Sequence, residues 1–313
     1  MHAPKHTSAL NADSDYFSWL ATPAQIFQNT HKDNPAAPQI PDFAANEYRR
    51  GYYASVTDVD VQVGHLLDEL TLLDLEHKTM VVLTADHGFA LGENNMWGKS
   101  TTYEAAARVP LLIKVPWLHS SAGRRVHSAV ESVGLYSTLV SLAELPTGEA
   151  LSQLQGDSFA HLLKSESSHD IAQSVAFVES PRQAPAKSAE FGVRTARWCY
   201  NEFYQVHHSG PRGSKSPATL YKEFLPSLDE LVGIELLDCS DKYVSVDGFE
   251  TNLALDHPDD YNSEIDHLAH LLRTNFQELP PFSLASLRNQ TRLLWTNQGR
   301  SRESQDPDLT VSA

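Results

Sequence analysis

A short apolar run that ends in an acid, an imidazole and a glycine constrains the fold of this chain more than any other segment. Residues 79–84 read Thr-Met-Val-Val-Leu-Thr, and Ala85-Asp86-His87-Gly88 follow at once. A β-branched run of this length is typical of a buried strand in a parallel sheet covered by helices. Because open α/β sheets bind ligands beyond the carboxyl ends of their strands, Asp86 and His87 are predicted to lie at a site.

Asp86 and His87 together suit a divalent cation, because the metal charge offsets desolvation of the carboxylate and the imidazole lends a lone pair. Lys99 lies thirteen positions after Asp86 and can fold back over the same crevice. The three side chains indicate a metal-assisted site for an anionic substrate oxygen, of sulfate or phosphate. The plainer alternative is turn chemistry, in which Asp86 caps a loop and Gly88 takes a positive φ angle.

Hydrophobic periodicity predicts a helix before this strand and further elements after it. Residues 48–73 carry apolar side chains at spacings of three and four, which predicts a helix with one face packed in the core. That stripe comprises Tyr52, Val56, Val59, Val63, Leu66, Leu67, Leu70 and Leu73. Residues 111–115 are predicted to form the next buried strand, and residues 133–145 a helix that Pro146 stops.

The pattern changes after about residue 165. A last core strand over residues 175–178 is expected, and then a linker rich in Pro, Ala and Ser up to Ala189. Residues 193–200 and 234–237 are predicted to be strands of a small antiparallel sheet. Ser263 is expected to cap a helix. The buried stripe of that helix would be Ile265, Leu268, Ala269, Leu272 and Phe276.

The block from Asp86 to Lys99, Asp-His-Gly-Phe-Ala-Leu-Gly-Glu-Asn-Asn-Met-Trp-Gly-Lys, resembles the sulfatase family, and within it the iduronate-2-sulfatase type. Weaker matches follow in the family's order over about residues 45–275. They include Tyr103-Glu104, Arg108-Val109-Pro110-Leu111, Gly192-Val193-Arg194-Thr195 and Glu235-Leu236-Leu237-Asp238. The resemblance covers only the carboxy-terminal part of such a protein.

This resemblance implies an α/β fold of the alkaline-phosphatase-like kind. Its mixed sheet, flanked by helices, would be present here in part, and a small C-terminal antiparallel sheet with a packed helix would follow. Residues 1–180 would form the C-terminal portion of the catalytic α/β domain. Residues 181–296 would form a small α+β subdomain, and residues 297–313 a disordered tail.

The resemblance also assigns the site. It implies that Asp86 and His87 are ligands of an active-site calcium, and that Lys99 is a catalytic residue that binds the sulfate group of the substrate. Calcium is a hard ion that prefers oxygen ligands. A nitrogen of His87 is more natural for zinc or manganese, so the choice of calcium rests on family likeness alone.

The chain departs from the family in its nucleophile. Sulfatases of this kind convert the cysteine of a Cys-x-Pro-x-Arg motif to formylglycine, and neither Cys199 nor Cys239 lies in such a motif. No serine replaces that cysteine, and the paired aspartates of the family's metal site have no counterpart either. Because losing the nucleophile costs many orders of magnitude in rate, we expect the chain alone to hydrolyse no sulfate ester. A Cys199–Cys239 bridge is compatible with the sequence but not required by it.

Composition limits the partners. A net charge of −16 disfavours nucleic acid, and it makes the average surface repel a sulfated glycan. A polyanionic substrate would therefore need a local basic patch. The candidates nearest the motif are Lys99, Arg108, Lys114, Arg124 and Arg125. No run is long enough to cross a membrane and the opening residues do not resemble a secretion signal, while family resemblance implies a lysosomal or secreted protein.

Three functions stay open. The first is a sulfatase-family hydrolase, represented by a truncated chain whose partners are a sulfated small molecule or glycan and a complementary N-terminal sulfatase fragment. The second is a metal-dependent phosphoesterase of the same superfamily, which needs a third histidine in a Gly-x-His-Gly-like context that this sequence lacks. The third is a noncatalytic sulfatase-like binding protein. Losing the first strands of a central sheet would expose edges and apolar surface, so the chain is expected to aggregate.

Overall fold

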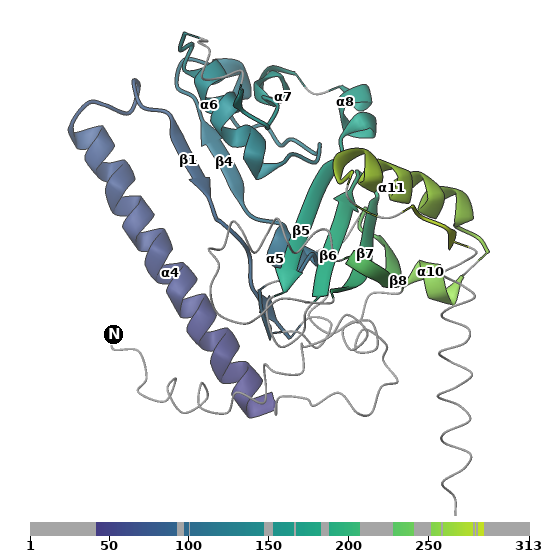
Figure 1. Cartoon of the computed structure of the whole chain (residues 1–313). Helices are drawn as coiled ribbons and strands as arrows, with labels where there is room; N and C mark the ends of the chain where they lie inside the picture. The colour runs from purple at the N-terminus through teal and green to yellow at the C-terminus, as the bar shows by residue number, and fades with distance from the viewer. Residues whose placement is uncertain are drawn as a thin grey trace, which may run out of the picture.

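The computed structural model places an N-terminal α/β part and a C-terminal antiparallel sheet side by side (Figure 1). It describes residues 42–92, 97–99, 101–146, 153–165, 167–182, 188–206, 228–240, 252–257, 259–277, 279 and 281–284. Every structural statement below concerns those residues. The expected disordered tail, 297–313, lies outside them.

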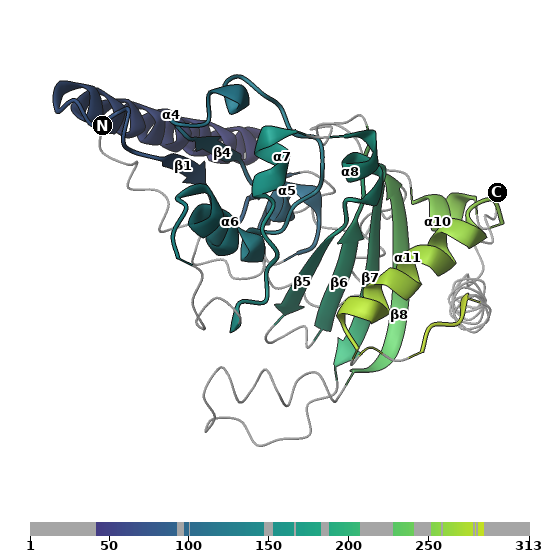
Figure 2. The same cartoon turned by 90° about the horizontal axis from the view of Figure 1, so that it is seen from above.

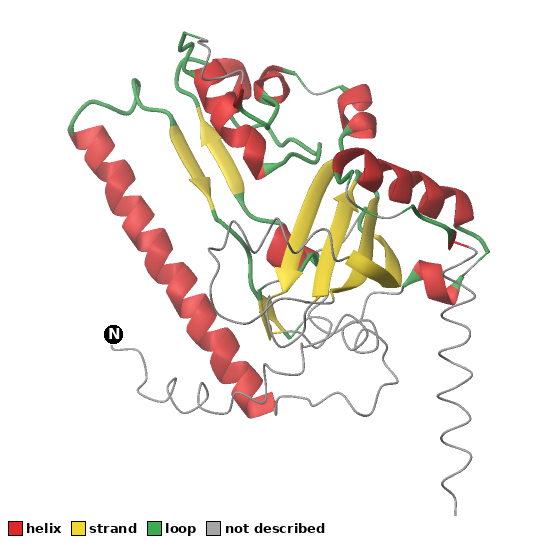
Figure 3. Ribbon diagram, viewed as in Figure 1, coloured by secondary structure: helices red, strands yellow, loops and turns green. Residues whose placement is uncertain are grey.

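The α/β part combines one long helix with short strands and short helices (Figure 3). Its elements are α4 (Asp42–Leu72), β1 (Val81–Thr84), β2 (Ala90–Leu91), β3 (Trp97–Gly98), α5 (Glu104–Ala107), β4 (Leu111–Lys114), η2 (His119–Ser121), η3 (Ser132–Gly134), α6 (Leu135–Leu142), α7 (Ala160–Lys164) and α8 (Ser168–Gln173). The strands predicted to end before Asp86 and to begin at Leu111 are confirmed, and so is the helix within residues 133–145. The predicted burial of the two strands is wrong, because β1 is half-buried at Val81 and Val82 and exposed at its end, and β4 alternates between half-buried and exposed residues.

The pairing of β1 corrects one expectation. β1 pairs with β4 in antiparallel orientation, from Val81 opposite Lys114 to Thr84 opposite Leu111. A parallel sheet was expected here, and among the described strands β1 has no parallel partner. The physical reason is the connection: residues 85–110 leave β1 at its carboxyl end and return at the same end, whereas parallel strands need a crossover to the opposite end.

Apolar side chains of β4 pack against α6, α7 and the turns near them. The buried members of this cluster are Val115, Leu142, Phe159, Ala160, Leu162 and Leu163, with Leu111, Ile113 and Leu135 partly buried around them. Thr138 of α6 supports the packing, because its hydroxyl accepts a hydrogen bond from the Phe159 amide at 3.0 Å. This cluster fixes β4, and through β4 the end of β1 where the predicted site begins.

Helix α4 contains the predicted helix but not its predicted packing. The helix has 31 residues and buries only Ala44 and Ala45 of its first turn. The expected core stripe is instead exposed over most of its length, with Val59 57% and Leu66 69% accessible. Its spacing is helical, as predicted, and Tyr52 at its start stacks on Phe89, but the larger part of the stripe stays exposed. Figures 1 and 2 show α4 on the side of the α/β part away from α11.

The C-terminal part is a four-stranded antiparallel sheet in the order β5-β6-β7-β8. Its strands are β5 (Ala176–Arg182), β6 (Ser188–Arg194), β7 (Trp198–Val206) and β8 (Leu228–Asp238). Two helices accompany them, α10 (Leu253–Asp256) and α11 (Asn262–Asn275), and α11 lies across one face of the sheet (Figure 2). The small antiparallel sheet with a packed helix is thus confirmed.

Two strand boundaries in this sheet differ from the expectations. Residues 175–178 were expected to close the first core, but they begin β5, which pairs with β6 as far as Arg182 opposite Ser188. Pro181 misled the prediction: it lies in an edge strand, where its missing N–H costs no ladder bond. Residues 193–200 are two strands, because the Thr195 amide donates to the Trp198 carbonyl and closes a tight turn.

Helix α11 provides the helical side of the C-terminal core. Ile265, Leu268, Ala269 and Leu272 are buried as predicted, and Phe276 packs at their edge. They lie against side chains of the sheet, among them Phe191, Val193, Tyr200, Tyr204 and Leu236. Ser263 is not the cap: the helix begins at Asn262 after Tyr261, which makes no side-chain capping bond. Packing against the sheet holds this helix, so it needs no strong cap.

Candidate active site

The three predicted site residues lie together at the carboxyl end of β1. The His87 Nε2 atom lies 2.6 Å from the Lys99 Nζ atom and 3.3 Å from an oxygen of Asp86. The His87 Nδ1 atom is 2.9 Å from the Gly88 carbonyl, which only accepts, so Nδ1 carries the proton. In a neutral ring the Nε2 lone pair is then free to accept from the Lys99 ammonium.

A two-stranded ribbon returns Lys99 to His87. Ala90 of β2 pairs with Gly98 of β3, and Leu91 pairs with Trp97, so the chain reverses between them. Gly92 and Gly98 have φ angles of 117° and 100°, in the region that favours glycine. Because Lys99 directly follows β3, closing this ribbon decides where its side chain lies. The thirteen positions from Asp86 to Lys99 are thus the length of chain that leaves β1 and comes back to it through the ribbon.

Gly88 has a role other than the one expected of a turn glycine. It is not among the described residues with positive φ. Its amide donates to the Ala106 carbonyl at 2.8 Å, and a Cβ atom on Gly88 would lie 2.2 Å from the Ala105 carbonyl oxygen. The glycine is needed because the backbone of α5 passes directly against it. The Asp86–Gly88 loop is therefore seated on α5, and the turn alternative with positive φ is wrong.

The donor set is too small for calcium within the described residues. Asp86 is 85% exposed and offers a carboxylate, and His87 is 37% exposed and offers one nitrogen. Calcium takes six to eight oxygen ligands, and no described group of three or more His, Cys, Asp or Glu residues is arranged to hold a metal. Asp86 and His87 could supply two ligands of a cation site, and the rest would have to come from elsewhere.

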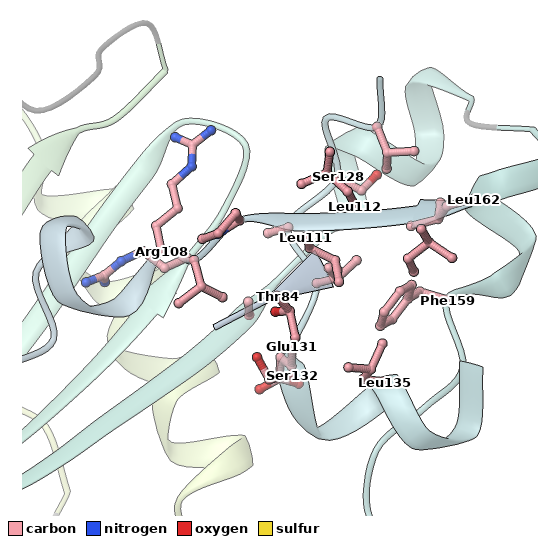
Figure 4. A pocket seen from close by; sticks show the side chains of 18 of the residues that line it. Thr84, Arg108, Leu111, Leu112, Ser128, Glu131, Ser132, Leu135, Phe159 and Leu162 are labelled. Carbon is pink, nitrogen blue, oxygen red and sulfur yellow. The ribbon is translucent and has the colours of Figure 1, made fainter. Parts of the chain in front are cut away.

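The site opens into one end of a large cavity of about 2820 Å³. Small-molecule pockets are roughly 300–1,000 Å³, so this space is too large for a single small ligand. Figure 4 shows part of its wall, where Leu111, Leu135 and Phe159 gather on one side and Arg108 reaches away from them. Burial raises the pKa of Glu131 in this wall, and its carboxylate accepts from the Phe177 amide at 3.1 Å.

The basic residues that the sequence proposed for a polyanion do line this cavity, but they are mixed with acids. Lys99, Arg108, Lys114, Arg124 and Arg125 are all in its wall, as are Glu76, Asp86, Glu104, Glu131 and Glu179. One of the arginines, Arg124, donates to the Lys164 carbonyl at 3.1 Å. The wall is therefore not a uniform basic patch.

Sequence reasoning missed the buried polar residues that support the site from the C-terminal sheet. Glu190, Arg194, Asn201 and Glu235 are all at most 9% exposed. Glu190, Arg194 and Glu235 contact residues 101–104, which follow Lys99 after one intervening residue, and Asn201 accepts a hydrogen bond from Arg194. A detectable signal exists, since Glu190 and Arg194 are four positions apart and so project from the same face of a strand. Such polar alternation usually marks a solvent-exposed face, so by itself it does not predict a buried one.

Family comparisons agree with the site motif. Residues 6–145 match the sulfatase family profile, and residues 92–210 match the profile described as N-sulphoglucosamine sulphohydrolase, C-terminal. The chain is related to the sulfatases. The first match contains the whole block from Asp86 to Lys99. It also begins at residue 6, well before residue 45, where the resemblance described above begins. The expectation of a sulfatase-family relative is confirmed.

Known sulfatases match this chain over a limited stretch. Mouse iduronate 2-sulfatase is 37% identical over 132 residues, which cover 34% of this chain and 24% of that protein. Human arylsulfatase K is 33% identical over 126 residues, covering 39% of this chain and 23% of that protein. The matched region thus spans about a quarter of the length of these relatives.

Solved structures share the fold. A phosphonate monoester hydrolase from Silicibacter pomeroyi has a TM-score of 0.56 at 23% identity, covering 81% of this chain and 47% of that one. BT4656 in complex with its substrate D-glucosamine-2-N,6-O-disulfate has a TM-score of 0.52 at 21% identity, covering 75% and 42%. The expected alkaline-phosphatase-like α/β fold is confirmed, and only part of it is matched.

No described helix of this sulfatase relative is both long enough and apolar enough to span a membrane.

Proposed function

We propose that this chain contributes to a sulfuric ester hydrolase of the iduronate-2-sulfatase type, which cleaves sulfate esters on a glycan. The convergence of Asp86, His87 and Lys99 at the carboxyl end of β1 is the observation that carries the proposal. Lys99 would bind the sulfate group, because an ammonium beside the ester offsets the negative charge that develops during cleavage. BT4656, with its sulfated sugar substrate, supports a sulfated glycan as the ligand.

Asp86 and His87 would be two ligands of a divalent cation, calcium by family likeness. Such a cation would hold the sulfate oxygens and polarise the ester. It would compete with Lys99 for the Nε2 lone pair of His87, since one lone pair serves one partner.

The nucleophile is not supplied by this sequence. No Cys-x-Pro-x-Arg motif is present, and Cys199 and Cys239 are joined in a disulfide. Neither sulfur can then be a precursor of formylglycine. We therefore propose that the chain by itself hydrolyses no sulfate ester. The disulfide also supports a lysosomal or secreted location, because such bonds persist in oxidising compartments.

The missing groups would come from a complementary sulfatase segment. Two observations support this partner: the exposed apolar face of α4 and a cavity several times larger than a small-molecule pocket. A segment that covers α4 and fills part of the cavity would bury apolar surface and bring further ligands to Asp86 and His87. The solved relatives have this much additional chain, because the match covers 42% and 47% of them.

Binding of inorganic sulfate and of Ca²⁺, measured separately by titration calorimetry, tests the site. Lys99→Met should weaken sulfate binding about tenfold or more, since a hydrogen bond to a charged group contributes about 1.5–3 kcal/mol. Asp86→Asn should weaken Ca²⁺ binding. Lys78→Met removes an exposed lysine before β1 and serves as the matched control. Equal sulfate affinity in Lys99→Met and the control would refute the role of Lys99.

A metal-dependent phosphoesterase is the second candidate, because phosphonate monoester hydrolases share the fold. Titration with inorganic phosphate and Zn²⁺ separates the two, and tighter binding of phosphate than of sulfate would favour the phosphoesterase. A noncatalytic binding protein remains the third candidate. It would be supported by a monodisperse chain that binds sulfate and gains no activity from any complementary segment.

A further inference from the structure

The two faces of the C-terminal sheet differ in chemistry. Side chains alternate along each strand, so Phe191 and Val193 of β6 face α11 while Glu190 and Arg194 face the other way. The same alternation separates Tyr200 from Asn201 on β7. The face away from α11 therefore carries acids, an arginine and an amide, yet these side chains are buried. The turn formed by residues 101–104 covers them.

This turn is held by an unusual number of polar contacts. Glu190 Oε2 accepts from the Thr101 hydroxyl and the Thr102 amide, both at 3.0 Å. The Tyr103 hydroxyl donates to Glu235 at 2.5 Å. Each of three consecutive residues after the site loop is thus bound by a buried group of the sheet.

Arg194 makes the densest set of these contacts. Its Nε atom donates to Glu104 at 2.9 Å, and its Nη2 atom donates to the Thr102 carbonyl and, at 3.0 Å, to Asn201 Oδ1. Only a planar guanidinium can reach these acceptors together. Gly192 makes the space for it, since a Cβ atom there would lie 2.9 Å from Arg194 Nη1 and 2.7 Å from Asn201 Oδ1.

The held turn adjoins both halves of the candidate site. Thr101 follows Lys99 after one intervening residue, so the turn fixes the end of the ribbon that carries Lys99. Glu104 begins α5, and the Ala106 carbonyl of α5 accepts the Gly88 amide of the Asp86–Gly88 loop. A shift of residues 101–106 would therefore change the distance between Lys99 and His87. The sheet can have this effect without touching the side chain of Lys99 or of His87.

We propose that Glu190 and Arg194 are positioning residues: they clamp residues 101–106 onto the C-terminal sheet and thereby set His87 and Lys99 at their contact distance. The identity of the ligand at the site rests on the proposed function. The clamp itself rests only on the contacts between the sheet and residues 101–104. Burying these charges costs solvation energy that an apolar face would avoid. The charged face instead fixes one register of the turn, since its donors and acceptors match only one arrangement.

Hydrogen exchange at the Gly88 amide tests the clamp without requiring activity or a metal. Arg194→Met should raise the exchange rate of this amide about tenfold, and Arg194→Lys should raise it nearly as much because a lysine lacks the fork. If Arg194→Met fails to fold, Glu104→Gln removes the charge that faces Arg194 and should also accelerate exchange, by several-fold. An unchanged Gly88 rate in the folded variants would overturn the proposal.

Arg273→Met is the matched control. Arg273 binds Glu202 on the opposite face of the same sheet, at 2.8 and 3.0 Å. The Arg273 side chain is 16% exposed and the Arg194 side chain 11%, so the two arginines are buried to a similar degree. Its loss should destabilise α11 and leave the Gly88 exchange rate within twofold of the wild-type rate. Equal acceleration in both variants would show a general loss of stability and refute positioning.

Sulfate titration of the same variants separates this proposal from the proposed function. If the wild-type chain binds no sulfate, the proposed role of Lys99 fails, while the Gly88 exchange rate still decides whether the clamp exists. If sulfate binds, Arg194→Lys should weaken it several-fold and Arg273→Met should not. Sulfate affinity that is unchanged in Arg194→Lys despite faster Gly88 exchange would refute the link between clamp and site.

Discussion

His87 illustrates how a single residue can serve two arrangements of one site. Its Nδ1 atom faces the Gly88 carbonyl, which fixes the ring, while Nε2 faces Lys99. A ring nitrogen held by a backbone carbonyl in this way is also found in imidazoles that bind metals. The same ring orientation therefore suits both the lysine contact seen here and a cation in its place.

Gly88→Ala should destabilise the folded chain, because the added Cβ atom would meet the Ala105 carbonyl oxygen at 2.2 Å. Overpacking of this kind costs about 1–3 kcal/mol of unfolding free energy. Gly51→Ala is the control, since a Cβ atom there meets nothing within 4 Å in exposed α4. It should stabilise the helix by about 0.5–1 kcal/mol. Urea unfolding of both variants measures the difference, and a Gly88→Ala variant as stable as wild type would contradict the close approach.

Glu131→Gln should change the pH dependence of stability. Burial raises the pKa of Glu131 above its ordinary value of 4.5, Asp157 adds to the rise and the Phe177 amide opposes it. An acid with a raised folded pKa binds more protons when folded, so its stabilising contribution is lost as pH rises through that pKa.

The variant should therefore gain stability relative to wild type between about pH 4 and pH 7, with glutamine still accepting from Phe177. Urea unfolding at both pH values measures the gain. A stability difference that is the same at both would show that the Glu131 pKa is not raised by folding.

At the scale of elements, the disulfide joins the start of β7 to the residue that follows β8. Cys199 and Cys239 are 40 residues apart in sequence, and Cys199 packs beneath Tyr103 and Ala90 of the site region. A cross-link that closes a loop of this length stabilises a fold by about 4 kcal/mol in the chain-entropy estimate.

Reduction with dithiothreitol should lower the free energy of unfolding by about this amount. A Cys199→Ala and Cys239→Ala double variant should show the lower stability with or without the reductant. Chemical unfolding under both conditions provides the measurement. If the reductant destabilises the double variant equally, the effect does not come from the disulfide.

At the scale of the whole molecule, the exposed apolar face of α4 is the feature most relevant to association. Val56, Val59 and Leu66 are all more than half exposed on one helix of 31 residues. Exposed apolar patches of this extent mark interaction surfaces or aggregation sites. The prediction that this stripe is buried in the core is therefore wrong for the described structure.

Purified chain should self-associate in a concentration-dependent way, and Val59→Lys with Leu66→Lys should reduce the association. The double variant Asp58→Lys with Asp68→Lys is the control. It raises the net charge of the chain by more than the first double variant does but removes no apolar surface, so it should reduce self-association less. Sedimentation velocity over a range of concentrations gives the mass. A wild-type monomer at every concentration, with one cooperative unfolding transition, would contradict the prediction.

Some features of this protein follow from local sequence alone. The strand into Asp86, the strand at Leu111, the helical periodicity of residues 48–73 and the buried stripe of α11 depend on neighbouring residues. The pattern of apolar spacing within each element is therefore sufficient to predict them. The sequence from Asp86 to Lys99 resembles a sulfatase site, and this resemblance predicted that Asp86 and Lys99 lie close together.

Other features were decided only by tertiary structure. Antiparallel pairing of β1 depends on the path of residues 85–110, and the exposure of α4 depends on segments that do not lie against it. Glu190 and Arg194 are buried beneath the turn after Lys99, which is far from them in sequence. The sequence by itself determined which elements form and which residues could do chemistry. Tertiary contacts determined what supports that chemistry, because burial and distance belong to pairs of residues far apart in the chain.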